Sequence, residues 1–122
     1  MILVINAGSS SIKTELFDDD LTSVLAADVA GIGGAGQLTL GDRRETVETS
    51  DHADALDIIM TALDMSGHPL HRLKAVAHRI VHGGARLTAP ARLTVEVQAE
   101  IAACIPLAPL HNPHNLACVH AL

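Results

Sequence analysis

The sequence is almost without aromatic residues. Among its 122 residues there is one Phe, and there are no Trp or Tyr. Proteins that hold single-stranded nucleic acid stack its bases on aromatic side chains, so this chain lacks such a platform. The net charge of −6 also argues against nucleic acid, whose binders carry a clustered basic face. We therefore expect an aliphatic core and no nucleic-acid partner.

Long apolar runs and cysteines are also scarce. No stretch approaches the ~20 apolar residues of a membrane helix, so no membrane partner is expected. The apolar N-terminal run is too short for a signal peptide and has no basic residue before it. The two cysteines, Cys104 and Cys118, are expected to be reduced core residues. These absences favour a cytoplasmic location and one globular domain, since domains run to roughly 100–200 residues.

Two common nucleotide-binding motifs are missing or out of place. The sequence contains no G-x-x-x-x-G-K-[ST], which excludes a P-loop. Gly31–Gly36 matches G-x-G-x-x-G, but that fingerprint works only between a strand and a helix N-terminus. The strand-like segment Gln37–Leu40 follows it here, so we interpret Gly31–Gly36 as a turn.

Acidic residues are missing between Met65 and Val95. That stretch contains five basic residues: Arg72, Lys74, Arg79, Arg86 and Arg92. An acid-free stretch rich in Arg can hold a small anion, although a solvated basic surface is the more ordinary interpretation. The pairs His78/His82 and His111/His114 lack the carboxylate or cysteine partners of a zinc site, so we interpret them as ordinary surface or core histidines.

Hydrophobic periodicity predicts an α/β fold. Strands are predicted at Ile2–Ile5, Ile12–Phe17, Val24–Val29, Gln37–Leu40, Arg44–Thr49 and Ala75–Val81. Helices are predicted to begin at the cap residues Ser50, Thr94 and Asn112, the last of which is followed by Pro113. Strands followed by alternating helices and strands indicate an α/β or α+β layer, which we expect to continue beyond the last predicted helix.

The turn between Asn6 and Lys13 is the first candidate site. It contains a glycine and three serines between two predicted strands, so its N–H groups and hydroxyls can surround a phosphate. Lys13 adds a positive charge, and the amide oxygen of Asn6 suits a hydrated Mg²⁺, which takes few protein ligands. On local sequence alone, an ordinary serine-rich hairpin explains the segment equally well.

Three segments together resemble the acetate kinase family. Val4–Lys13 resembles its N-terminal signature, Ala77–Gly84 resembles its H-R-[VI]-V-H-G-G motif, and Ala108–Pro113 resembles its A-P-L-H-N-P motif. The segments occur in the family's order, and the resemblance spans nearly the whole chain. It implies that residues 1–122 form an incomplete N-terminal ribonuclease H-like lobe of the actin, sugar kinase and heat-shock ATPase group.

The resemblance also implies a reaction and the cofactors that serve it. Members of the family transfer a phosphoryl group between ATP and acetate, giving acetyl phosphate and ADP, with Mg²⁺. Asn6 would lie near the Mg²⁺ and the transferring phosphoryl group, and Lys13 would lie near the nucleotide phosphates. The remaining nucleotide-binding residues would be those of the serine-rich turn: Gly8, Ser9 and Ser11.

Four residues are implied at the acyl end of the site. Arg79 would hold the carboxylate or acyl phosphate and act in catalysis. Val81 and Leu110 would line the small apolar pocket for the acetate methyl group, although in most proteins such residues belong to the core. His111 would lie at the edge of the site.

Three alternatives to an acetate kinase fragment stay open. Propionate and butyrate kinases share these motifs, so the acyl group stays open. The chain could also be a non-catalytic phosphate- or nucleotide-binding module, or a purely structural fragment that binds nothing. Family members are far longer than this chain and are expected to be homodimers. Their other catalytic groups lie beyond the region that corresponds to Leu122. We therefore expect the chain alone to be inactive as a kinase.

Overall fold

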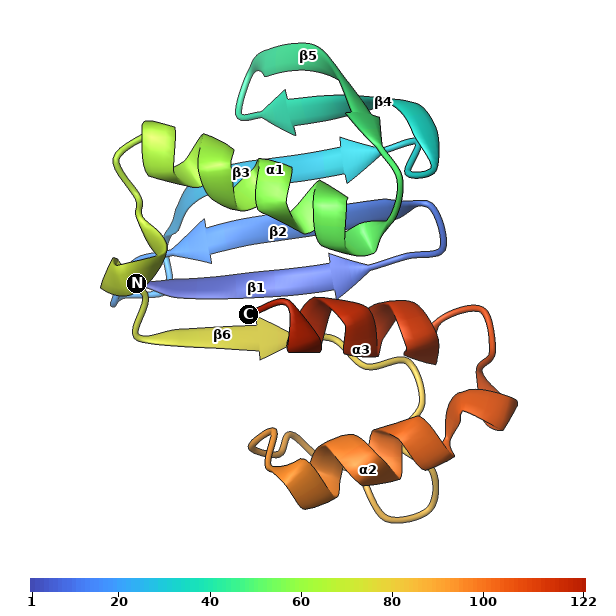
Figure 1. Ribbon diagram of the computed structural model, residues 1–122. Coiled ribbons are helices and arrows are strands. Elements are labelled where there is room, and N and C mark those ends of the chain that lie inside the picture. The colour runs from blue at the N-terminus through green and yellow to red at the C-terminus, as the bar shows by residue number, and fades with distance from the viewer.

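A six-stranded mixed sheet forms the body of the structure, a computed structural model that describes residues 1–122 (Figure 1). The strands are β1 (Ile2–Ala7), β2 (Ser11–Phe17), β3 (Ser23–Ala30), β4 (Gly34–Leu40), β5 (Arg43–Thr49) and β6 (Ala75–His78). Their spatial order is β5-β4-β3-β2-β1-β6. Consecutive strands from β1 to β5 are antiparallel, whereas β6 returns beside β1 and runs parallel to it.

Helices cover one face of this sheet. The α-helices are α1 (His52–Met65), α2 (Val95–Ala103) and α3 (Asn112–His120), and the short 3₁₀ helices are η1 (Leu70–Arg72) and η2 (Ile105–Leu107). α1 crosses β2 and β3, while α3 lies beside α1 over β1 and β6 (Figure 1). α2 contacts α3 and lies away from the sheet (Figure 1). None of the helices is long and apolar enough to cross a lipid bilayer.

The core lies between the sheet and α1. Side chains alternate along β1, where Leu3, Ile5 and Ala7 are buried while Val4 and Asn6 are exposed. Such alternation is typical of a strand with one covered face and one open face. The sheet face opposite α1 is therefore open to solvent within this chain.

The predicted α/β class is confirmed, and most predicted elements lie within a few residues of their expected bounds. The rejection of the dinucleotide fingerprint is also confirmed, because Gly31–Gly36 joins β3 to β4 and no helix follows it. Cys104 and Cys118 are both buried and unpaired, as expected of core cysteines. Burial raises the pKa of the Cys118 thiol to about 11.

Two predicted helix starts were wrong by one residue. Asp51, and not Ser50, caps α1, because its side chain accepts a hydrogen bond from the N–H of Asp54 at 2.9 Å. His111, and not Asn112, precedes α3, because the Asn112 side chain is fully buried and bonds to other segments. The capping preference of Asn was overridden by these longer-range hydrogen bonds.

The last predicted strand was too long at its C-terminal end. β6 ends at His78, whereas the prediction extended it to Val81. The N–H groups of Val81 and His82 donate to the side chains of Asn115 and Asn112 at 3.0 and 3.2 Å. The backbone therefore leaves the sheet where these side chains replace a neighbouring strand as hydrogen-bond partners.

Candidate functional site

The serine-rich turn lies between β1 and β2, at the end of the sheet where β1 finishes. Asn6 and Lys13 are opposite each other in the β1–β2 register, and both are exposed. The N–H of Gly8 donates to the carbonyl of Ser11 at 2.7 Å and closes the turn, with Ser9 exposed at its tip. We call Gly8–Ser11 the serine bend.

Lys13 forms no ion pair within the chain. Its cross-strand neighbour on β3 is Asp28. One carboxylate oxygen of Asp28 accepts a hydrogen bond from the N–H of Thr14 at 3.1 Å. The three ion pairs of the structure join Asp19 to the N-terminus and to Lys74, and join Arg86 to Glu100. The ammonium group of Lys13 is therefore free to attract an anion.

β6 brings Arg79 to the same end of the sheet. Its N–H donates to the carbonyl of Ile5 at 2.9 Å, one residue beyond the last β1–β6 pair, so its backbone lies beside Asn6. The Arg79 side chain is exposed and belongs to no ion pair, so no acid neutralises it. The fold thus joins Asn6, Lys13 and Arg79, which come from two distant motifs.

Two buried asparagines of α3 organise the loop that follows Arg79. Asn112 donates from Nδ2 to the carbonyl of His82 at 2.9 Å, and its Oδ1 accepts from the N–H of the same residue. Asn115 accepts from the N–H of Val81 at 3.0 Å and donates to the carbonyl of Ala7 at 3.0 Å. α3 thereby ties the end of β1 to the loop after β6.

Sequence reasoning missed Asn115 and gave Asn112 the wrong role. Both side chains are at most 1% exposed, which is rare for asparagine unless every polar atom finds a partner. The available signal was their spacing of three residues, which places two amides on one face of the predicted last helix. Such a polar pair on a packed face indicates specific buried hydrogen bonds.

The glycines of the His82–Gly84 segment meet steric demands. A Cβ on Gly83 would lie 2.2 Å from the carbonyl oxygen of Leu87, and Gly84 has a φ of +66°. Only glycine fits both positions without strain. These glycines shape the loop beside Arg79 and are not required to touch a ligand.

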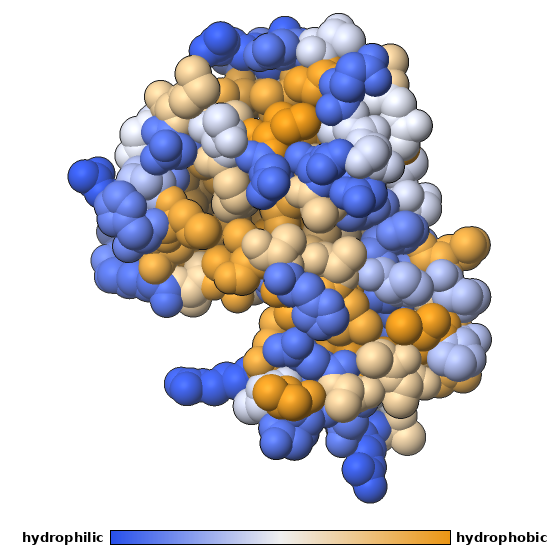
Figure 2. All heavy atoms as spheres, in the orientation of Figure 1, coloured by the Kyte–Doolittle hydropathy of each residue, from blue (hydrophilic) through white to orange (hydrophobic).

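The residues implied at the acyl end are more scattered. Val81 is half-buried, Leu110 is 69% exposed, and His111 is exposed just before α3. Apolar side chains come to the surface at the end of the molecule that carries α2 (Figure 2), where Val95, Leu107 and Leu110 are all exposed. Neither Val81 nor Leu110 lines the groove described next.

A large groove of the structure lies elsewhere. It measures about 730 Å³ and runs between β6, α2 and the segment Leu87–Leu93. Its lining is mostly apolar and includes His78, whose pKa is lowered from its usual value because the ring is buried. Asn6, Lys13 and Arg79 do not line this groove, so the cationic end of the sheet is a separate surface.

No three His, Cys, Asp or Glu side chains lie close enough together to hold a metal ion. A hydrated Mg²⁺ needs far fewer protein ligands, and the exposed amide of Asn6 fits that requirement.

Comparison with known proteins identifies the family. The geometry defines the class of the chain: an α/β protein whose sequence motifs lie together at one end of a mixed sheet. The profile of the acetokinase family matches residues 1–122, so the chain belongs to that family.

Bacterial acetate kinases are similar to this chain over almost all of its length. That of Deinococcus deserti is 41% identical over 127 residues, which cover 99% of this chain and 32% of the relative. That of Streptomyces avermitilis is 42% identical over 125 residues, which cover 94% of this chain and 31% of the relative. The chain thus spans about a third of the length of the curated relatives that it matches.

Solved structures agree with the sequence relatives. Porphyromonas gingivalis acetate kinase matches with a TM-score of 0.87 at 34% identity, over 98% of this chain and 33% of that one. A propionate kinase from Francisella tularensis matches with the same TM-score of 0.87 at 28% identity, over 98% of this chain and 32% of that one. The six-stranded sheet and its helices therefore correspond to the N-terminal region of these kinases.

Proposed function

We propose that this chain forms part of the site of an acetate kinase-type enzyme that transfers a phosphoryl group between ATP and acetate. In this proposal residues 1–122 are the N-terminal, incomplete portion of a ribonuclease H-like lobe. The observation that carries the proposal is the placement of two exposed cations that form no ion pair, Lys13 and Arg79, on the segments that flank Asn6 in the sheet.

The chemistry of phosphoryl transfer suits such a surface. Charge spreads over the phosphoryl oxygens in the transition state, so catalysis is mostly positioning and electrostatic stabilisation. The planar fork of Arg79 matches a carboxylate or phosphoryl group and stays charged at all working pH values. Lys13 and the N–H groups of the serine bend would face the nucleotide phosphates.

Magnesium would be held through Asn6. Its exposed amide oxygen would bind the ion directly or through one of the ion's waters, since Mg²⁺ retains several waters in protein sites. When bound, the ion neutralises phosphate charge beside Lys13. Gly8, Ser9 and Ser11 would contact the phosphates from the other side.

The acyl group would lie near the start of α3. Val81 and Leu110 would contact the acetate methyl group, and His111 would lie at the edge of the site. Exposed Leu110 would become buried only against substrate and the rest of a longer enzyme. The similarity to a propionate kinase makes a longer acyl group the second candidate, since one added methylene changes binding by only about 1 kcal/mol.

A binding comparison on the purified chain tests the proposal. Isothermal titration with acetyl phosphate, and with ADP and Mg²⁺, should show weak binding that Arg79→Ala reduces at least tenfold, because the charge-assisted contact is lost. Arg72→Ala is the matched control, since Arg72 is also exposed and unpaired but lies in η1, before β6. Equal binding by the wild type and Arg79→Ala would contradict the assignment and favour a purely structural role.

A further inference from the structure

Two successive carbonyl groups at the end of β1 are held by side chains from two different helices. Asn115 of α3 donates to the carbonyl of Ala7 at 3.0 Å. His52, in the first turn of α1, has its Nε2 atom 2.6 Å from the carbonyl oxygen of Gly8. Both side chains are nearly fully buried, His52 at 3% exposed and Asn115 at 1%. Nδ2 of Asn115 and Nε2 of His52 are thus both committed to the backbone at the entry to the serine bend.

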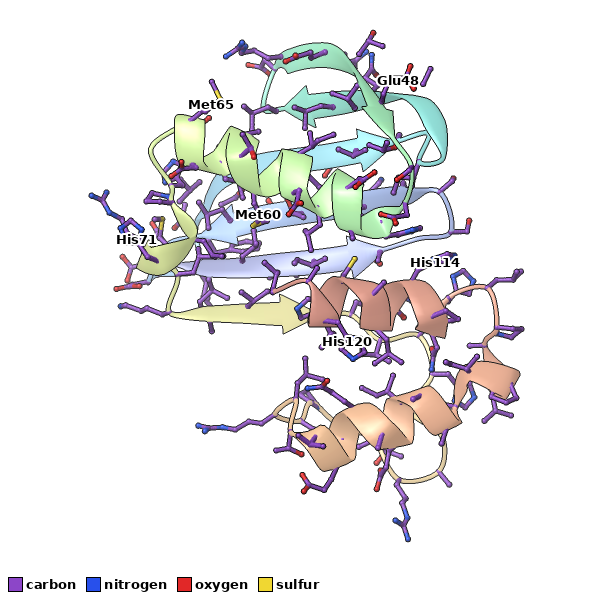
Figure 3. All side chains as sticks on the ribbon, viewed as in Figure 1. Glu48, Met60, Met65, His71, His114 and His120 are labelled. Atoms are coloured by element: carbon purple, nitrogen blue, oxygen red, sulfur yellow. The ribbon has the colours of Figure 1, made fainter.

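The two helices are also joined through a pair of stacked histidines. The rings of His52 and His114 have centroids 4.0 Å apart and planes inclined by 13°. Figure 3 shows His114 on the side of α3 that is turned toward the beginning of α1. Burial lowers the pKa of His114, and the nearby His52 and His111 lower it further. The stack therefore favours the neutral form of the His114 ring.

The geometry of the peptide bond links His52 to the ligand side of the bend. A trans peptide is planar, so the carbonyl of Gly8 and the N–H of Ser9 point in opposite directions. Fixing the Gly8 carbonyl toward α1 turns the Ser9 N–H away from the helix and toward the exposed side. In the same way, fixing the Ala7 carbonyl orients the N–H of Gly8, which donates to Ser11 at 2.7 Å.

We propose that His52 is a positioning residue for anion binding: its Nε2–H donates to the Gly8 carbonyl and so aims the Ser9 N–H at a bound phosphoryl group. The ring of His114 holds the His52 ring in place by stacking. The part of this proposal that concerns the anion rests on the proposed function above. The part that concerns the orientation of the bend stands on the contacts of His52 alone.

A measurement on the wild-type chain decides the donor role without any mutation. Long-range ¹H–¹⁵N NMR correlations of the imidazole report which ring nitrogen carries the proton. We expect the hydrogen on Nε2 of His52 at pH 7.5. A neutral ring protonated only on Nδ1 would overturn the proposal, because Nε2 could then donate nothing to Gly8.

Two substitutions then separate the hydrogen bond from the packing of the ring. His52→Gln keeps an amide donor at a similar reach but loses the ring, whereas His52→Phe keeps the stack on His114 but has no donor. We expect His52→Phe to weaken phosphate binding at least threefold and to increase the mobility of the Ser9 amide in ¹⁵N relaxation. His52→Gln should stay within twofold of wild type. His120→Phe, at an exposed position at the end of α3, is the control and should bind as wild type does.

The outcomes distinguish this proposal from the proposed function. A His52→Phe chain with wild-type affinity and wild-type Ser9 mobility would overturn the positioning role, and so would equal losses in the Gln and Phe variants. If the wild-type chain bound no phosphate, the proposed function would fail. The Ser9 mobility and the His52 tautomer would then still decide the positioning role.

Discussion

His78 and His114 are the two histidines whose pKa values are lowered by folding. Burial is the main cause of the lowered pKa of each, because a charged imidazolium loses its hydration inside the protein. Near His114 the stacked ring of His52 and the neighbouring His111 act in the same direction. Folding therefore favours the neutral form of both rings.

This linkage predicts that the chain loses stability as the pH falls below 6.5. Unfolded histidines take up protons near pH 6.5, whereas folded His78 and His114 do so only at lower pH. Stability is thus fully present above pH 6.5 and declines as the pH falls from there through the lowered pKa values. Urea unfolding at pH 7.5 and at about pH 5 should show a lower midpoint at the acidic pH.

The double variant His78→Asn/His114→Asn should flatten this pH dependence. His71→Asn is the matched control, since His71 is exposed in η1, and should leave the dependence unchanged. A midpoint that does not move between the two pH values in the wild type would contradict the linkage. The lowered pKa values of Asp19, Asp54 and Glu96 act in a more acidic range and do not disturb the comparison.

At the scale of elements, the β3–β4 hairpin depends on a close approach of its two strands. A Cβ on Gly36 would lie 2.4 Å from the carbonyl oxygen of Ala30, a backbone atom that cannot move without breaking the β3–β4 register. The turn also touches the serine bend, because the N–H of Ile32 donates to the carbonyl of Ser10 at 3.0 Å. The β3–β4 hairpin is therefore in direct contact with the candidate site.

Gly36→Ala should destabilise the chain by about 1–3 kcal/mol, the usual cost of forcing extra volume into a packed place. Gly34→Ala is the matched control, because nothing lies within 4 Å of its added Cβ and its φ is not positive. Chemical denaturation of both variants should separate them clearly. Equal stability of the two would show that the strands can move apart at Ala30.

The sequence alone predicted the elements whose conformation is determined by their own residues. The alternation in β1 and β2 and the 3.6-residue period of α1 are local signals, and these elements form where they were expected. The prediction failed where a side chain from a distant segment determines the local backbone, as at Val81 and Asn112. The hydrogen bonds of these residues join the loop that follows β6 to α3. The meeting of Lys13 and Arg79 came from a family resemblance, since periodicity does not show which strands are neighbours.

At the scale of the whole molecule, the chain corresponds to about a third of the kinases that it resembles. It supplies one exposed, unpaired lysine and one such arginine to the proposed site. Removal of charge-clamping groups in phosphoryl transfer typically lowers the rate by 10³–10⁵. The remaining groups of the proposed site would have to come from outside these 122 residues.

The isolated chain should therefore show no measurable acetate kinase turnover. A coupled assay that follows acetate-dependent ADP formation checks this, with a full-length acetate kinase as the positive control. Turnover at ordinary kinase rates, about 1–100 per second, would show that Asn6, Lys13 and Arg79 suffice.

The strand order has a consequence for how the molecule assembles during synthesis. β1 to β5 and α1 are consecutive in the chain and contact one another, so their partners are all present before β6 has been made. β6 and α3 then dock against β1, which lies far earlier in the sequence, and such long-range pairing is the slow part of folding. Arg79 therefore comes to lie beside Asn6 only when β6 docks. A nascent chain that stalls before β6 is made has the antiparallel strands β1–β5 and Lys13, but lacks Arg79.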